Sequence, residues 1–293
     1  MTALDARTRA SRLTCWSGPV EPVPLKGGIT NANFVVADRG ERFFVRIGDD
    51  IPIHGVMRFA ELAASRAAEA AGISPGIIHH EPGALVFRFI DATTLTPEAV
   101  RPRAMLERIL PLIRRCHRDM PKHLRGPVLM FWPFHIFRDY AASLRERGSR
   151  MVPKLPELDR IATELQAMIG PIDLVFGHND LLAANFLDAS DRLWLIDWDY
   201  AGYSSSLFDL ANLSSNNDVT PEDERWLLEA YFERKLDGGL WRRYHAMKCA
   251  SLMRETMWSM IAEHVSKIDF DYVAYTDDYM ARLERALGEL KRL

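Results

Sequence analysis

Cysteine is scarce in this sequence, and its few copies are widely spaced. The 293 residues include three cysteines, Cys15, Cys116 and Cys249, and none of them forms a C-x-x-C pair. This spacing indicates neither a disulfide framework nor a zinc site made of cysteines. We therefore expect a protein of the reducing cytoplasm.

Long apolar runs and an excess of one charge are also missing. No window approaches the roughly 18 apolar residues of a membrane span, and the opening MTALDARTRASRL lacks the apolar core of a signal peptide. The 37 basic and 40 acidic residues leave a formal charge of −3. Such a balance gives no basic field for nucleic acid or an anionic membrane surface, so we expect neither as a partner. The sequence carries no sign of its oligomeric state.

What the sequence does have is the composition of an ordinary globular protein. Hydrophobic residues make up 48% and charged residues 26% of the chain. At this length a chain can bury a sizeable core, so no disulfide or structural metal is required.

The first third of the chain is rich in short apolar runs. Residues 31–47, NANFVVADRGERFFVRI, predict two strands joined at Asp38-Arg39-Gly40. A helix is expected over 57–71 because the stretch is rich in alanine and is followed by Gly72 and Pro75. A further strand is expected over 84–90.

From Thr96 onward the pattern favours helices, beginning with a cap residue followed by proline. The longer helices that we expect cover residues 102–118, 134–147, 155–169, 221–236, 241–265 and 276–291. Short strands at 174–176, 185–187 and 193–196 interrupt them. The sequence therefore predicts an α+β protein of two lobes: a small β-rich lobe with one helix, residues 1–92, and a larger mainly helical lobe, residues 93–293.

The β insert carries the chemistry. His178, Asp180 and Asn185 form the pattern H-x-D-L-x-x-x-N, and Asp197 follows twelve residues after Asn185 at a strand end. This is the spacing of a kinase catalytic loop followed by a metal-binding aspartate. The alternative is that these residues are turn formers and strand-end caps, but the coincidence of four positions favours catalysis.

Each residue type suits phosphoryl transfer. The protein must position a hydroxyl, accept its proton and neutralise phosphate charge with Mg²⁺. Asp180 is expected to orient and deprotonate the acceptor alcohol, and Asn185 and Asp197 to supply oxygen ligands to magnesium. For His178 we favour a structural role, in which its ring holds the backbone. Asp209 is expected either to anchor the catalytic loop through backbone N–H groups or to cap a helix.

On these residues the chain resembles the choline/ethanolamine kinase family, within the aminoglycoside-phosphotransferase-like, protein-kinase-like fold. The resemblance covers nearly the whole chain. The matching stretches are 27–34, 44–47, 178–185, 196–200 and 254–275. It implies a kinase that transfers the γ-phosphoryl group of ATP, with Mg²⁺, to the hydroxyl of choline or a related amino alcohol.

The resemblance also assigns a nucleotide site. The turn at Gly27 and Gly28 would let the backbone approach the phosphates, with Thr30 and Asn31 as polar donors. Arg46 stands where protein kinases have a lysine, and it would be held by a glutamate of the following helix. Glu61 is the candidate for that glutamate, and Glu69 is the alternative on the same helix.

The acceptor pocket follows from chemistry together with the resemblance. A quaternary ammonium donates no conventional hydrogen bond, so aromatic faces and carboxylates hold it best. The residues that match the family's pocket are Asp199, Tyr200, Trp258, Phe270 and Tyr275. Packing of these aromatic residues into the core is the competing interpretation.

One departure from the family bears on the substrate. Three residues before Trp258 the family has a second tryptophan, whereas this chain has Glu255. That change weakens the assignment of choline and favours a smaller or less methylated amine. Among enzymes of this fold, the alternatives are ethanolamine, thiamine and aminoglycoside kinases. The alternative that is not an enzyme is a pseudokinase, which would bind ligands without catalysis.

Overall fold

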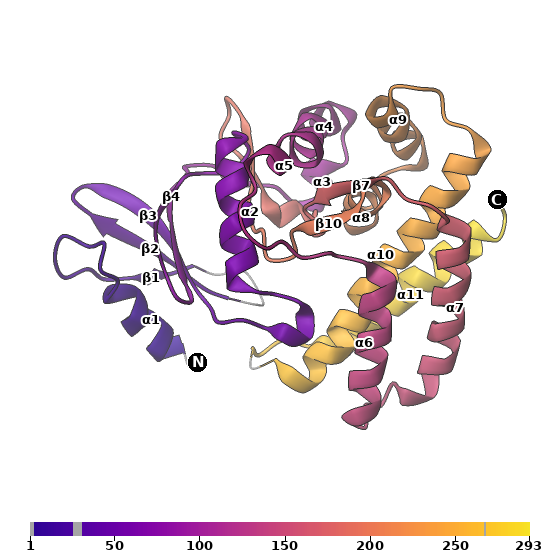
Figure 1. Cartoon of the computed structure of the whole chain (residues 1–293), viewed down its shortest axis with the longest axis horizontal. Helices are drawn as coiled ribbons and strands as arrows, with labels where there is room; N and C mark the ends of the chain where they lie inside the picture. Colours follow the sequence, from indigo (N-terminus) through magenta and orange to yellow (C-terminus); the bar gives the residue numbers. More distant parts are fainter. Residues whose placement is uncertain (1–2, 26–30, 267) are drawn as a thin grey trace.

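A computed structural model describes residues 3–25, 31–266 and 268–293 of the chain. Figure 1 shows two parts of the molecule. The smaller part is an antiparallel sheet with two helices, and the larger part is mainly helical. The expectation of an α+β protein with two lobes of unequal size is confirmed.

The first sheet contains five antiparallel strands in the order β1-β2-β3-β5-β4. Their bounds are β1 (Val23–Pro24), β2 (Ala32–Asp38), β3 (Glu41–Ile47), β4 (Ile77–Glu81) and β5 (Ala84–Arg88). The predicted hairpin lies between β2 and β3. Arg39 and Gly40 form its two-residue turn with φ of 51° and 81°, the left-handed pair that a right-handed strand twist requires.

A helix covers each face of this sheet. α1 (Ala3–Ser11) packs Ala6 and Ala10 against Val36 and Val45 in a small separate core. Successive residues of a strand point to opposite faces, so Arg46 is directed away from α1. It faces α2 (Arg58–Ala70), the helix that the alanine-rich segment predicts. This alternation decides which residue of β3 reaches the site.

The larger part consists mostly of helices. They are α3 (Pro97–Val100), α4 (Arg103–Arg118), α5 (Met120–His123), α6 (Pro133–Glu146), α7 (Leu155–Ile169), α8 (Ser206–Asn217), α9 (Pro221–Phe232), α10 (Gly238–Val265) and α11 (Tyr272–Leu290). The side chain of Thr96 caps α3 as predicted, by accepting from Ala99 N–H. α9 ends four residues earlier than expected, because Glu233 adopts a left-handed φ of 54°.

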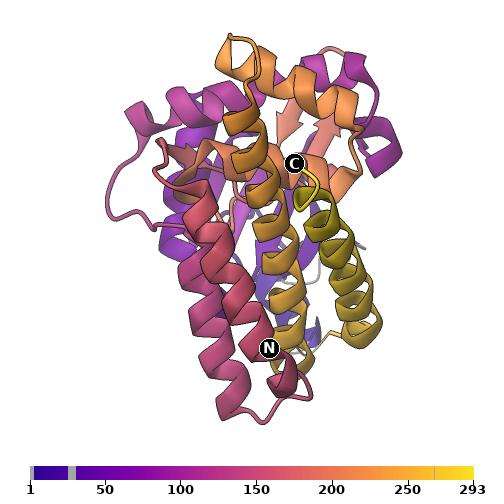
Figure 2. The same cartoon turned by 90° about the vertical axis from the view of Figure 1, so that its right-hand side faces the viewer.

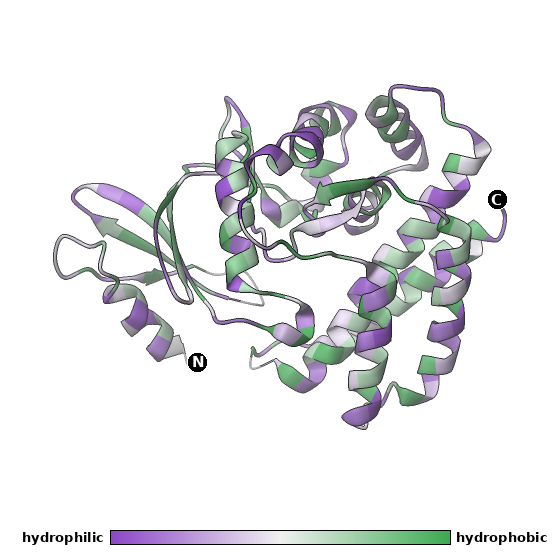
Figure 3. Cartoon of the chain, in the orientation of Figure 1, coloured by the Kyte–Doolittle hydropathy of each residue, from purple (hydrophilic) through white to green (hydrophobic). Residues whose placement is uncertain are grey.

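Four long helices lie side by side in Figure 2: α6, α7, α10 and α11. α10 is central and is buried along most of its 28 residues. Figure 3 shows hydrophobic and hydrophilic residues alternating along its neighbours, as expected of helices with one face in a core. Among the helices of the described residues, none is long and apolar enough to cross a membrane.

Short strands between these helices frame two loops. β7 (Leu174–Gly177) pairs with β10 (Gly202–Ser205), and β8 (Phe186–Asp188) lies between β6 (Thr93–Thr94) and β9 (Leu193–Leu195). The loops at residues 178–185 and 196–201 therefore start and end on paired strands. Since β6 pairs with β8, residue 93 already takes part in this second sheet, and the lobe boundary near 92 remains a prediction.

The three cysteines are free thiols. Cys116 on α4 and Cys249 on α10 are buried, whereas Cys15 is half-buried beside the small core of α1. Burial raises the pKa of Cys249 to about 12.

Candidate active site

The predicted catalytic loop, residues 178–185, is anchored by Asp209, in the first turn of α8. Its Oδ2 accepts from His178 N–H at 2.8 Å and its Oδ1 from Asn179 N–H at 2.7 Å. Ser205 is the N-cap of α8, so the alternative that Asp209 caps the helix is wrong. A Cβ at Gly177 would lie 2.9 Å from Asn179 Oδ1 and 3.1 Å from Asp209 Oδ2, so a larger residue would displace side chains of this anchor.

His178 holds the loop from inside, as the structural interpretation expects. Its Nε2 donates to the carbonyl of Ile196 at 2.9 Å, and its Nδ1 accepts from Asp180 N–H at 3.3 Å. The ring is therefore a neutral Nε2–H tautomer. Burial lowers its pKa, in agreement with that assignment.

Two asparagines of α8 complete the anchor, and the sequence analysis did not identify them. Asn212 Oδ1 accepts from Leu181 N–H at 2.5 Å, and Asn217 Nδ2 donates to Leu181 O at 3.0 Å. Both side chains are buried in a helix that is buried along its whole length. A clue was available for Asn212, because it follows Asp209 by three positions and residues three or four apart lie on one face of a helix.

Asp180 lies at the centre of the loop. Asn185 Nδ2 donates to the Asp180 carbonyl at 2.8 Å, which leaves the Asn185 amide oxygen free of that bond. Burial raises the pKa of the Asp180 carboxyl to about 8, the neighbouring Arg254 opposes this shift, and Glu255 adds to it. A carboxyl group with its pKa near neutrality is suited to accept a proton.

Arg46 and Glu61 meet as predicted, and they meet beside Asp197. The Arg46 guanidinium forms an ion pair with Glu61 from α2 and donates to Asp197 Oδ1 at 2.9 Å. Arg46 and Glu61 are buried, whereas the Asp197 side chain is 40% exposed. Glu69 is not the partner, because its carboxylate accepts from Ile77 N–H.

Asp199 belongs to the same network of buried charges. Its Oδ1 is paired with Arg46 and, at 2.9 Å, with Arg58, and its Oδ2 accepts from Asn31 Nδ2 at 2.9 Å. Arg58 also pairs with Glu61, so Arg58 and Arg46 share two carboxylates. The contacts of Asp199 therefore differ from those expected of an acceptor-binding residue, and that role remains only a prediction. Arg58 is a residue that the sequence analysis missed.

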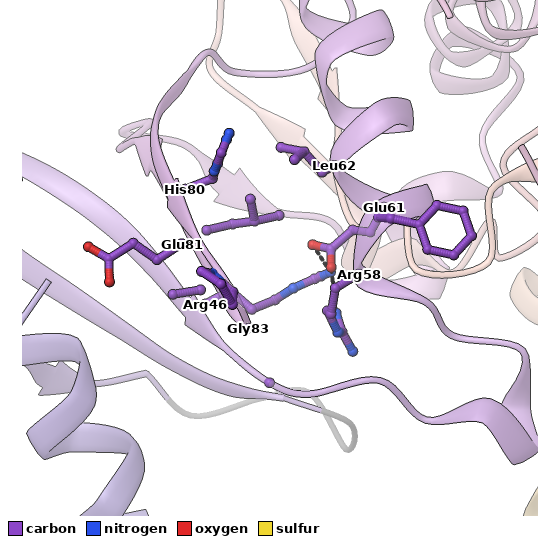
Figure 4. A pocket seen from close by; sticks show the side chains of 12 residues that line it. Arg46, Arg58, Glu61, Leu62, His80, Glu81 and Gly83 are labelled. Atoms are coloured by element: carbon purple, nitrogen blue, oxygen red, sulfur yellow. Dashed lines mark hydrogen bonds and ion pairs between the residues drawn. The ribbon is translucent and has the colours of Figure 1, made fainter. Parts of the chain in front are cut away.

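A cavity of about 260 Å³ lies beside the ion pair of Arg46 and Glu61. Figure 4 shows Glu61 reaching from α2 toward Arg46 on β3, with Arg58 beside it and the β4–β5 turn at Gly83 opposite. The remainder of the predicted nucleotide site, Gly27, Gly28 and Thr30, lies outside the described residues.

Most of the predicted acceptor residues form one aromatic cluster, which we define as Tyr200, Trp258, Phe270 and Tyr275. Trp258 Nε1 donates to Tyr200 Oη at 2.9 Å. The ring of Tyr275 lies 6.4 Å from Trp258 and 5.6 Å from Phe270, between centroids. Trp258 is 5% exposed and Phe270 is 40% exposed. The cluster thus extends from the core of the larger lobe to its surface.

Three further side chains contact this cluster, and the sequence analysis did not assign them to the site. The ring of His54 lies tilted beside that of Trp258, with 5.5 Å between centroids, and His54 Nδ1 is hydrogen-bonded to Tyr140 Oη at 2.9 Å. Arg254 and Glu255, consecutive on α10, form an ion pair of 2.7 Å. Arg254 also lies 3.8 Å from Asp180, which connects the aromatic cluster with the catalytic loop.

The fold and the anchored loop place the chain in the class of two-lobed, protein-kinase-like proteins. The sequence profile described as choline/ethanolamine kinase matches residues 23–226, more than half of the chain. The chain therefore belongs to the choline/ethanolamine kinase family.

Individual relatives agree with this assignment. The chain is 26% identical over 215 residues to protein LicA of Haemophilus influenzae, covering 72% of this chain and 62% of LicA. It is 28% identical over 255 residues to ethanolamine kinase of Drosophila melanogaster, covering 72% of this chain and 48% of that kinase. The match thus spans only about half to two thirds of these relatives. Among solved structures, a choline/ethanolamine kinase family protein of Mesorhizobium loti is similar, with a TM-score of 0.76, 28% identity and coverage of 100% and 97% of the two chains.

Proposed function

We propose that this chain transfers the γ-phosphoryl group of ATP, in the presence of Mg²⁺, to the hydroxyl of choline or a related amino alcohol. The observation that carries the proposal is the catalytic loop of a family member: Asp180 lies on a loop held by Asp209, with Asn185 and Asp197 beside it. A pseudokinase without the base or a metal ligand would not need this arrangement.

Within this proposal, Asp180 orients the acceptor hydroxyl and takes its proton as the oxygen attacks the phosphorus. The loop anchors keep the carboxylate in place, so little of its freedom has to be lost during the reaction. Arg46, fixed by Glu61, supplies positive charge to the nucleotide phosphates.

The residues present fit a magnesium ion. Mg²⁺ prefers oxygen ligands and commonly binds one or two protein side chains together with substrate phosphates. The amide oxygen of Asn185 and the exposed carboxylate of Asp197 provide such ligands. When bound, the ion would neutralise phosphate charge.

The test is phosphate transfer from ATP to a panel of acceptors: choline, ethanolamine, thiamine and an aminoglycoside. We expect Mg²⁺-dependent turnover with choline, ethanolamine or both, and much weaker turnover with the other two. ATP binding without transfer to any acceptor would support the pseudokinase alternative. Preferred transfer to thiamine or the aminoglycoside would retain the kinase and reject the amino alcohol.

A further inference from the structure

The chain places a cation of its own in the aromatic cluster. The guanidinium carbon of Arg254 lies 4.2 Å from the centroid of the Tyr200 ring and 5.7 Å from that of Phe131. Only 2% of the Arg254 side chain is exposed. A guanidinium so close to a ring face makes the cation–π contact that an ammonium ligand would otherwise make.

Stability alone does not explain this arginine. Its Nε and Nη2 are buried and have no hydrogen-bond partner among the described residues. Buried donors without partners destabilise a fold, and a buried ion pair is often no better than apolar residues of the same volume. An arginine in this position therefore indicates a role in the site.

Glu255 places a carboxylate between Arg254 and Tyr275 of the aromatic cluster. Its Oε2 pairs with Arg254, and its Oε1 accepts from Tyr275 Oη at 2.9 Å. A carboxylate has about four acceptor positions, so both oxygens retain capacity for a further N–H donor. The charge of Arg254 is paired with that of Glu255, and Arg254 also lies 3.8 Å from the carboxyl group of Asp180.

We propose that the Arg254–Glu255 pair selects an acceptor whose ammonium still carries N–H bonds, a primary amino alcohol, over a quaternary one; this rests on the function proposed above. A primary ammonium donates hydrogen bonds to Glu255. A quaternary ammonium donates none and relies on aromatic faces, and Arg254 already occupies one face of Tyr200.

The first measurement is kcat/KM of the unmodified protein for ethanolamine and for choline at saturating Mg·ATP. We expect ethanolamine to be favoured by at least about tenfold. Equal values, or a preference for choline, would overturn the inference and leave the kinase assignment intact. Turnover with neither acceptor would instead reject the proposed function on which the inference rests.

Two variants test the residues themselves. Glu255→Gln removes the charge but keeps the shape, and we expect it to lower kcat/KM for ethanolamine at least fivefold more than for choline. Arg254→Met frees the face of Tyr200, and we expect the choline-to-ethanolamine ratio to rise at least fivefold. If both variants change the two acceptors equally, the pair is only structural and the inference fails.

A matched control is available on α4. Arg103 also stacks on an aromatic ring, that of Trp226 at 4.5 Å, and pairs with Asp223. Arg103→Met is expected to leave the choline-to-ethanolamine ratio unchanged; a change equal to that of Arg254→Met would also overturn the inference. Melting curves identify any variant that fails to fold. Should Arg254→Met be one of them, the isosteric Glu255→Gln and the unmodified protein decide the question.

Discussion

The carboxylate of Asp180 depends on its neighbours for its position. His178 and Asn179 bond to Asp209, Leu181 bonds to two asparagines, and Asn185 bonds to the carbonyl of Asp180 itself. These contacts fix the backbone on both sides of the residue. A change confined to the carboxyl group should therefore leave the loop in place.

Asp180→Asn is expected to lower kcat by about 100- to 10,000-fold, because proton acceptance is lost while positioning survives. The dissociation constant for Mg·ATP should stay within about twofold. Steady-state kinetics and calorimetric titration on the same preparation give both values. Turnover close to that of the unmodified protein would show that Asp180 is not the base.

The two proposed metal ligands, Asp197 and Asn185, should contribute unequally to the binding of Mg·ATP. Asp197 has a left-handed φ of 67°, which asparagine tolerates and alanine does not, so Asp197→Asn removes the charge without backbone strain. We expect it to weaken Mg·ATP binding about tenfold more than Asn185→Ala, since an ionic ligand is lost instead of a neutral one. Calorimetry with ATP in the presence and absence of Mg²⁺ measures this. Equal affinity in the two variants would contradict the assignment.

Trp258→Ala is expected to raise the KM for the acceptor about five- to thirtyfold, because a face for the cation is lost. The residue is buried, so unfolding should also become easier by about 3–5 kcal/mol. Tyr275→Phe keeps the ring and removes only the hydroxyl bonded to Glu255, so it separates the two effects. If Trp258→Ala loses stability while the acceptor KM is unchanged, Trp258 is core alone.

For single residues, the motif spacing predicted which loop residues make up the candidate site. Asp180, Asn185 and Asp197 lie within eighteen positions of one another in the chain, and short loops keep them together. Asp199 was assigned to the acceptor because it matches the acidic position of the family's pocket. Its partners Arg58 and Asn31 are 141 and 168 residues away along the chain, and local patterns carry no signal for pairs at such separation.

Among the elements, long amphipathic helices were predicted closely and small or polar ones were not. α4, α6 and α7 begin and end within a residue of the expected positions. α8 was missed because its sequence, SLFDLANLSSNN, is rich in serine and asparagine, which have low helix propensity. Tertiary packing and the bonds to the catalytic loop stabilise it instead. The short strands β4 and β10 were not predicted, because their sequences show no clear alternation of apolar and polar residues.

The 3₁₀ turn η1 (Pro52–His54) supplies a prediction about pH. Burial, and then the charge of Arg254, lower the pKa of His54 from 6.5 to about 3. The unfolded chain therefore binds a proton between these pH values while the folded chain does not, and stability falls as pH falls through that window. His54→Gln should reduce the slope of unfolding free energy against pH by up to about 1.4 kcal/mol per unit.

Urea unfolding at several pH values between 4 and 7 measures this slope. His80→Gln is the matched control, because the side chain of His80 on β4 is exposed. An unchanged slope in His54→Gln would show that the imidazole is not held neutral.

On the scale of the whole molecule, charges and one histidine connect the two lobes. Arg46 and Arg58 from the smaller lobe pair with Asp199 of the larger one, and the ring of His54 contacts that of Trp258. The ion pairs include Arg46, which is proposed to bind the nucleotide. The lobe geometry and the nucleotide site are therefore expected to depend on each other.

Arg58→Met tests that dependence. We expect the KM for ATP to rise about tenfold and the free energy of unfolding to fall by about 1–3 kcal/mol, because Asp199 and Glu61 each lose a buried partner. The KM for the acceptor should change much less. Arg66→Met, at an exposed position of the same helix, is the control. An ATP KM equal to that of the control would show that Arg58 does not support the nucleotide site.

The distribution of the thiols gives the chain a built-in reporter. A maleimide or disulfide reagent meets one half-buried cysteine in the folded protein, Cys15 beside the small core of α1, and reaches the two buried cysteines, Cys116 and Cys249, only after the larger lobe opens. A fluorophore attached at Cys15 would sit on the smaller lobe, whereas the predicted catalytic loop belongs to the larger one. The rate at which the other two sulfurs become labelled would then record opening of the larger lobe, without any engineered substitution.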